Sequence, residues 1–134
     1  MQTAIGVKSI PKRAQGTIAQ SVILAYGDTE FTAKTAGAGE EKLIGISERN
    51  GPYSGPSIRN TQDTQPDMMV DVIYTGIAQC LFGAGSIAYG DPVKPDADGR
   101  AVLATSGDVA IGICNEVAAE GFYGQVRLQI HTVA

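Results

Sequence analysis

Glycine interrupts every long apolar segment of this 134-residue chain, and this pattern limits the secondary structure that the chain can form. A glycine inside a helix is less favourable than an alanine by about 1 kcal/mol, and helices below about a dozen residues are marginal even without one. The 17 glycines therefore leave no long stretch suited to a helix. The sequence predicts a mainly β protein.

Alternating apolar and polar side chains support this prediction. In the segment GQVRLQIHTV, Val126, Leu128 and Ile130 alternate with polar residues, which is the period of two expected of a half-buried strand. Runs rich in β-branched residues, bounded by Gly, Pro and Asp, occupy residues 68–82, 100–105 and 109–118. Because a chain of this length favours one domain, we expect a compact sandwich or barrel-like β body over residues 16–134.

The two halves of this body resemble each other weakly. The segment GTIAQSVILAYGD returns as TGIAQCLFGAGSIAYGD, and LIGISE returns as IGICNE in the same order. We infer a drifted duplication of residues 16–48 and 75–116, in which each copy covers an apolar face of the other. The Gly-, Pro-, Asn- and Ser-rich stretch 47–67 is interpreted as a loop inserted between the halves.

The segment DADG at residues 96–99 raises the possibility of a calcium loop, because Asp91, Asp96 and Asp98 lie close together in sequence. A calcium loop also needs a late bidentate Glu, whereas Gly99 leads here into Arg100 and an apolar run. Asp and Gly at these positions are instead typical of a tight hairpin. We predict a turn and no metal site.

The segment GAGSIA at residues 83–88 formally matches a dinucleotide-binding fingerprint. That fingerprint requires a helix whose N-terminus holds the pyrophosphate, and Pro92 prevents a helix here. The sequence therefore predicts a glycine-rich connection between strands and no cofactor.

Catalytic groups are also missing from the sequence pattern. The single histidine, His131, falls on the polar face of the last predicted strand. Cys80 and Cys114 align with Ser21 and Ser47 in the two halves, so we expect two buried free thiols in a reducing compartment. We predict that the protein is not an enzyme.

The charge balance excludes other classes of partner. A net charge of −4 with 14 acidic residues argues against binding to a nucleic-acid backbone, which depends on clustered cations. No apolar run approaches the roughly 20 residues that span a bilayer, and the N-terminus lacks the pattern of an export signal. We expect neither nucleic acid nor membrane as a partner.

Residues 88–130 resemble the head decoration, or capsid cement, proteins of tailed bacteriophages. The likeness rests on AYGDPVKPDADGRA, on GDVAIGICNEVAAEG and on the closing VRLQI strand. It implies a non-catalytic protein that is made in the host cytoplasm and binds the outer face of the capsid, with the major capsid protein and further copies of itself, usually in a homotrimer, as partners. A non-catalytic carbohydrate-binding or host-surface-binding β module remains the alternative, although the chain has no tryptophan.

The N-terminal segment differs from the acidic remainder of the chain. We expect residues 1–15 to form an extended arm, because basic residues there combine with Pro11 and Gly16, which discourage regular structure. A frayed terminus is the alternative. The predicted contacts with capsid or neighbouring subunits are Lys8, Ile10, Pro11, Lys12 and Arg13.

Overall fold

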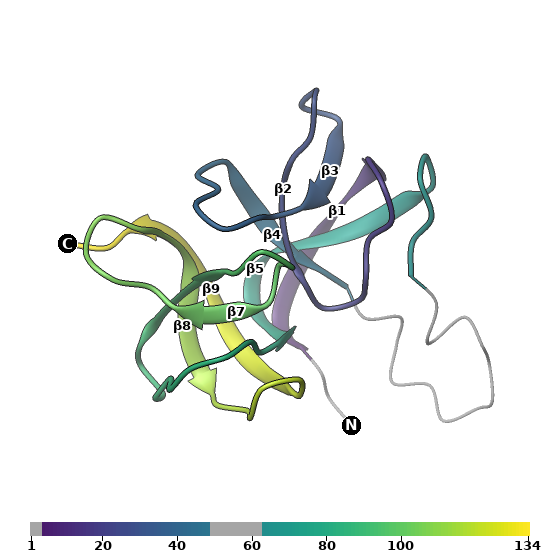
Figure 1. Ribbon diagram of the computed structural model, residues 1–134. Helices are drawn as coiled ribbons and strands as arrows, with labels where there is room; N and C mark the ends of the chain where they lie inside the picture. The colour runs from purple at the N-terminus through teal and green to yellow at the C-terminus, as the bar shows by residue number, and fades with distance from the viewer. Residues whose placement is uncertain (1–3, 49–62) are drawn as a thin grey trace.

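The computed structural model describes residues 4–48 and 63–134 and contains a single mixed sheet of nine strands (Figure 1). The described residues form no helix, so the predicted mainly β fold is confirmed. The strands are β1 (Ala4–Ala14), β2 (Ile23–Tyr26), β3 (Thr32–Thr35), β4 (Leu43–Ser47), β5 (Met69–Leu81), β6 (Pro92–Pro95), β7 (Ala101–Leu103), β8 (Val109–Glu116) and β9 (Tyr123–Thr132).

The sheet closes into two rings of strands that share β5, and Figure 1 shows the two halves on either side of it. The first ring runs β1-β3-β2-β4-β5 and closes because β5 also pairs with β1. The second ring runs β5-β9-β8-β6-β7 and closes through a parallel bridge between Phe82 and Ala101. Closure leaves few unpaired strand edges, which is the advantage of a barrel over an open sheet.

Two apolar clusters form the core. One fills the first ring and includes Val22, Leu24 and Val72. The other joins the two halves, because it contains Ile23 from the first ring together with Ile111 from the second. β2 and β4 thus bury side chains on both faces, which explains why their sequences read as continuous apolar runs. This second cluster therefore packs the two halves against each other.

The second ring repeats the pairing scheme of the first. In each ring the first strand meets the third in parallel, at Ala14 and Ala33 in one case and at Phe82 and Ala101 in the other. The other pairings in both rings are antiparallel and follow the same order. This repeated topology supports a duplication, with β5 serving as the last strand of one unit and the first of the next.

The segments LIGIS and AIGIC occupy equivalent places in the two rings. The Ser47 amide donates to the carbonyl of Val22 over 2.9 Å, and the Cys114 amide donates to the carbonyl of Asp91 over 2.8 Å. Both side chains are buried. The predicted correspondence of Ser47 and Cys114 agrees with this pairing.

The correspondence inferred from IAQS and IAQC is wrong. Ser21 donates its amide to the carbonyl of Ser47, and the residue that does the same for Cys114 is Gly90. Cys80 lies inside β5, paired with Gly124, whereas Ser21 lies between β1 and β2. The IAQ match was misleading because it is only three residues long, and three common residues can recur by chance.

Residues 4–14 do not extend away from the body as the predicted arm would. They form β1, which pairs with β5 from Ala4↔Ala78 to Arg13↔Met69. Pro11 does not prevent this pairing, since a proline is tolerated where one side of the strand has no partner, and β1 meets β3 only at Arg13 and Ala14. Most of the predicted 47–67 loop lies outside the described residues.

The predicted hairpin at DADG is confirmed. It joins β6 to β7, and Gly99 takes a φ of +77° in the turn. The Asp96 carboxylate accepts hydrogen bonds from the amides of Asp98 and Arg100 at 2.8 and 2.9 Å and pairs with the Arg100 guanidinium at 3.0 Å. Its oxygens therefore stabilise the turn.

Two features of Ser21 are unfavourable for stability. It has a φ of 57°, which favours glycine, and its buried hydroxyl has no hydrogen-bond partner. Ser21→Gly should stabilise the protein by about 1 kcal/mol, because it removes both costs while adding some unfolded-state entropy. Urea denaturation would measure the change. Gly90→Ser, which adds only the φ cost at an exposed site, is the matched control, and a less stable Ser21→Gly protein would contradict the expectation.

Candidate interaction surface

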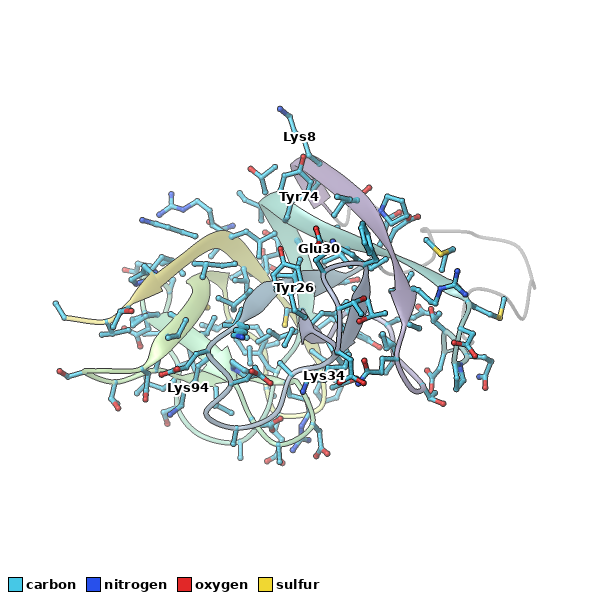
Figure 2. All side chains as sticks on the ribbon, turned by 90° about the horizontal axis from the view of Figure 1, so that it is seen from above. Lys8, Tyr26, Glu30, Lys34, Tyr74 and Lys94 are labelled. Atoms are coloured by element: carbon cyan, nitrogen blue, oxygen red, sulfur yellow. The ribbon has the colours of Figure 1, made fainter. Side chains whose placement is uncertain are left out.

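All five residues predicted to contact other subunits lie on β1, and most of that strand faces solvent. From Gly6 to Arg13 no residue is buried on either face of the strand. Main-chain pairing with β5, rather than side-chain burial, therefore holds this segment in place. In Figure 2, Lys8 projects beyond the strands at the edge of the molecule.

Ile10 and Lys12 lie at a surface hollow where the two rings meet. The rim of this hollow is formed by side chains from β1, β2, β5 and β9, and its floor by two buried residues of β4. Its lining residues are Ile10, Lys12, Tyr26, Leu43, Ile44, Tyr74 and Ile130. Lys8, Pro11 and Arg13 lie outside the hollow, so the structure divides the five predicted residues between two places.

Lys12 connects the two sides of the hollow. Its ammonium lies 5.2 Å from the centre of the Tyr26 ring and donates a hydrogen bond to the carbonyl of Glu30. A cation over an aromatic face is stabilised by about 0.5–1 kcal/mol at an exposed site. Figure 2 shows Tyr26, Glu30 and Tyr74 close together in the view from above. The contact leaves the ammonium at the rim of an otherwise apolar depression.

Tyr74 reaches the hollow because the pairing of β1 with β5 is irregular. Lys8 pairs with Thr75 and the next residue, Ser9, pairs with Ile73, so Tyr74 is an extra residue on β5. Such a bulge re-aims a side chain relative to the regular alternation. This explains why sequence reasoning missed Tyr74, because the alternation of side chains alone does not reveal a bulge.

A second exposed apolar group lies on the turn between β8 and β9. Val117, Phe122 and Tyr123 are 48%, 65% and 39% exposed. The turn is anchored on both sides of Phe82, whose amide donates to the carbonyl of Phe122 and whose carbonyl accepts from Gly121, each over 2.9 Å. A fixed turn that presents an aromatic ring to water is informative, since folding alone does not require it. The neighbouring Phe and Tyr in the sequence could have signalled this surface.

The titratable groups of the described residues do not assemble into a reaction centre. Burial raises the pKa of Cys80 to about 12 and raises that of Cys114, so neither thiol is poised to ionise. Both cysteines are free. His131 places its Nδ1 2.7 Å from the carbonyl of Gln129 on β9. Across residues 4–48 and 63–134, no group of three metal-ligating side chains occurs.

Asp108 gives the fold a pH dependence. Hydrogen bonds from Lys94, at 2.8 Å, and from Thr105 lower its pKa to about 2. Because the folded pKa lies below the ordinary value of 3.8, these interactions stabilise the protein above pH 4 and are lost as the pH falls toward 2. The midpoint of urea denaturation should fall between pH 4 and pH 2 in the wild type. We expect this fall to be smaller in Lys94→Met, because the variant lacks the hydrogen bond from Lys94 to Asp108. An equal fall in wild type and Lys94→Met would contradict a contribution of this pair to the pH dependence.

The fold defines an all-β protein whose sheet closes into rings, and comparison with known proteins identifies its class as a structural component of the bacteriophage capsid. Residues 7–130 match the XM1 gp53 minor capsid protein family. The chain belongs to this family. No curated protein matches it. In the described residues, no helix is long and apolar enough to cross a membrane.

A solved structure from another bacteriophage illustrates the similarity of the fold. The head fiber gp8.5 N base of bacteriophage phi29 is 18% identical in sequence, with a TM-score of 0.58, and the alignment covers 96% of this chain and 98% of that one. At this identity the likeness concerns the fold. It covers both rings, so the two-ring architecture recurs in another phage head protein.

Proposed function

We propose that this protein binds the outer surface of a bacteriophage capsid as a homotrimer and stabilises the shell by bridging adjacent major capsid subunits. The single observation that carries the proposal is β1, a strand that is unburied from Gly6 to Arg13 and carries all five predicted contact residues. Membership of a minor capsid family supports the location in the virion. The resemblance of residues 88–130 to capsid cement proteins supports the bridging role.

The charge distribution favours a protein surface as the partner of β1. Residues 1–15 contain Lys8, Lys12 and Arg13 and no acidic residue. A cationic strand on an acidic body steers its exposed side toward acidic groups of the partner. Several weak contacts that form together reach a high combined affinity, because each trimer engages the shell at more than one place.

Capsid occupancy tests the proposal. Purified shells would be incubated with wild-type protein and with the Lys8→Glu/Arg13→Glu variant, and bound protein would be counted by cryo-electron microscopy and quantitative gel analysis. We expect the variant to lose at least about tenfold in affinity, since rim charges govern encounter and each reversal places like charges together. The control is Lys42→Glu/Arg127→Glu, which makes the same charge change at exposed cations outside β1. Equal occupancy of wild type and variant, or protein bound inside the shell, would contradict the proposal.

Binding of a carbohydrate or host surface is the second candidate, and one observation favours it. Tyr89 is 80% exposed and shares a surface hollow with Asn115 and Arg127. An exposed ring beside amide and guanidinium groups can stack on a sugar and bind its hydroxyls. Glycan-array binding that disappears with Tyr89→Ala, while capsid occupancy is unchanged, would favour this function over bridging.

A further inference from the structure

We infer that the hollow rimmed by Ile10, Lys12, Tyr26, Tyr74 and Ile130 binds residues 116–123 of a second copy of this chain, which are the β8–β9 turn with the last residue of β8 and the first of β9. This inference rests on the proposed homotrimer and assigns its interface. In this arrangement the hollow contacts a neighbouring copy, and Lys8, Pro11 and Arg13 remain available to contact the capsid.

Cyclic symmetry demands two different surfaces. In a ring of three copies every contact is heterologous, so one patch on each copy must complement another patch on the next. The chain carries two such candidates with no residue in common, a concave one lined by β1, β2, β4, β5 and β9 and a projecting one where β8 leads into β9. In Figure 1 the β8–β9 turn lies at the outer end of the second half, away from β2 and β3.

The two surfaces are complementary in charge. Removing the three cations of residues 1–15 from the totals of 10 basic and 14 acidic residues leaves 7 and 14, so the remainder of the chain carries −7. The β8–β9 turn contributes Glu116 and Glu120 to this excess, and both are exposed. The hollow offers the Lys12 ammonium at its rim. Attraction between them fixes the register of the contact and disfavours other pairings.

The two surfaces are also complementary in polarity. Val117 and Phe122 project from the turn with about half or more of their surface exposed, and Ala118 packs inward to hold the turn on the core. The hollow has a floor of Leu43 and Ile44 and aromatic walls. A buried aromatic anchor surrounded by a polar rim is the usual organisation of an interface hot spot.

The turn is suited to act as such an anchor because it is already ordered. Its main chain is fixed to Phe82 by two hydrogen bonds, and the Glu120 carboxylate lies 4.0 Å from Arg100. A projection that is rigid before association loses little conformational entropy on binding. The strand run predicted from the sequence ends at residue 118, inside this segment, and gave it no contact role, so this role follows from the structure.

Charge reversal with restoration tests the inference on the full-length chain. Sedimentation velocity and native mass spectrometry would compare wild type, Lys12→Glu, Glu116→Lys/Glu120→Lys, and the combination of all three. We expect a wild-type trimer, a rise in the dissociation constant of at least about tenfold for each separate variant, and recovery in the combination. Tyr74→Ser and Phe122→Ser should weaken the trimer in the same way, with Tyr89→Ser as the matched exposed-aromatic control.

A mixing experiment tests whether the contact is heterologous. A chain with a defective hollow, Tyr74→Ser, keeps an intact turn, and a chain with a defective turn, Phe122→Ser, keeps an intact hollow. The mixture should form one-to-one heterodimers that neither variant forms alone. Circular dichroism would establish that each variant is folded.

Three outcomes separate this inference from the proposed function. A trimer that is insensitive to every one of these substitutions would overturn the interface and leave the trimer standing. A wild-type chain that stays monomeric up to millimolar concentration would overturn both the interface and the trimer, while capsid occupancy would still judge the capsid-binding proposal. Variants that remain trimeric and lose only capsid occupancy would assign the hollow to a capsid segment and overturn the inference.

Discussion

Gly45→Ala and Gly112→Ala should each destabilise the protein by more than about 3 kcal/mol, which is a large fraction of the roughly 5–15 kcal/mol that stabilises a typical domain. A Cβ on Gly45 would lie 2.0 Å from the carbonyl oxygen of Ile73, and a Cβ on Gly112 would lie 2.1 Å from that of Arg127. Both obstacles are main-chain atoms of the neighbouring strand. Relief therefore requires separation of two paired strands, in contrast to a clash with the end of a flexible side chain.

Urea denaturation followed by circular dichroism would measure both losses. Gly37→Ala is the matched control, because a Cβ at that glycine meets no atom within 4 Å. The two rings make a sharper expectation possible. Since the contacts around Gly45 and Gly112 are almost the same, the two substitutions should cost similar amounts within about 1 kcal/mol. An alanine at either site with wild-type stability would show that the strands are less closely packed than described.

These two glycines also show which part of the fold the sequence reveals. The repeated IGI segment was recognised as a duplication, and its register agrees with the structure because in both rings the glycine lies against the main chain of the paired neighbouring strand. The IAQ repeat satisfied no such requirement and fell at unrelated places. A repeated motif thus predicts strand register reliably where steric constraints require one of its residues at that position.

Other features of the fold were predictable from the sequence only where a local pattern determines them. Alternation and turn residues predicted β9 and the β6–β7 hairpin, since both are local patterns. The pairing of β1 with β5 is a contact between distant segments, and β1 has no buried side chain between Gly6 and Arg13 to signal it. For the same reason Ile10 and Lys12 were selected as members of the basic N-terminal segment, whereas their partners in the hollow could not be found from the sequence.

Phe82→Ala should destabilise the protein by about 3–5 kcal/mol, through lost burial and the cavity left behind. Phe82 is 1% exposed and belongs to the cluster that joins the two halves. Its equivalent in the first ring of strands is Ala14. The second ring of strands therefore has a phenyl side chain where the first has only a methyl group. The cavity cannot easily collapse, because Gly124 already brings the main chain of β9 against the Phe82 ring.

The position of Phe82 links this loss to the contact surface. Its main-chain amide and carbonyl anchor the β8–β9 turn and remain after the substitution, whereas the ring that supports Gly124 is removed. The substitution should therefore accelerate hydrogen exchange more at residues 116–124 than at β2 and β4. Phe82→Leu, which keeps most of the buried volume, is the control and should cost about 1 kcal/mol. A Phe82→Ala protein with wild-type stability and unchanged exchange in the turn would show that the cluster joining the two halves and the interface turn are independent.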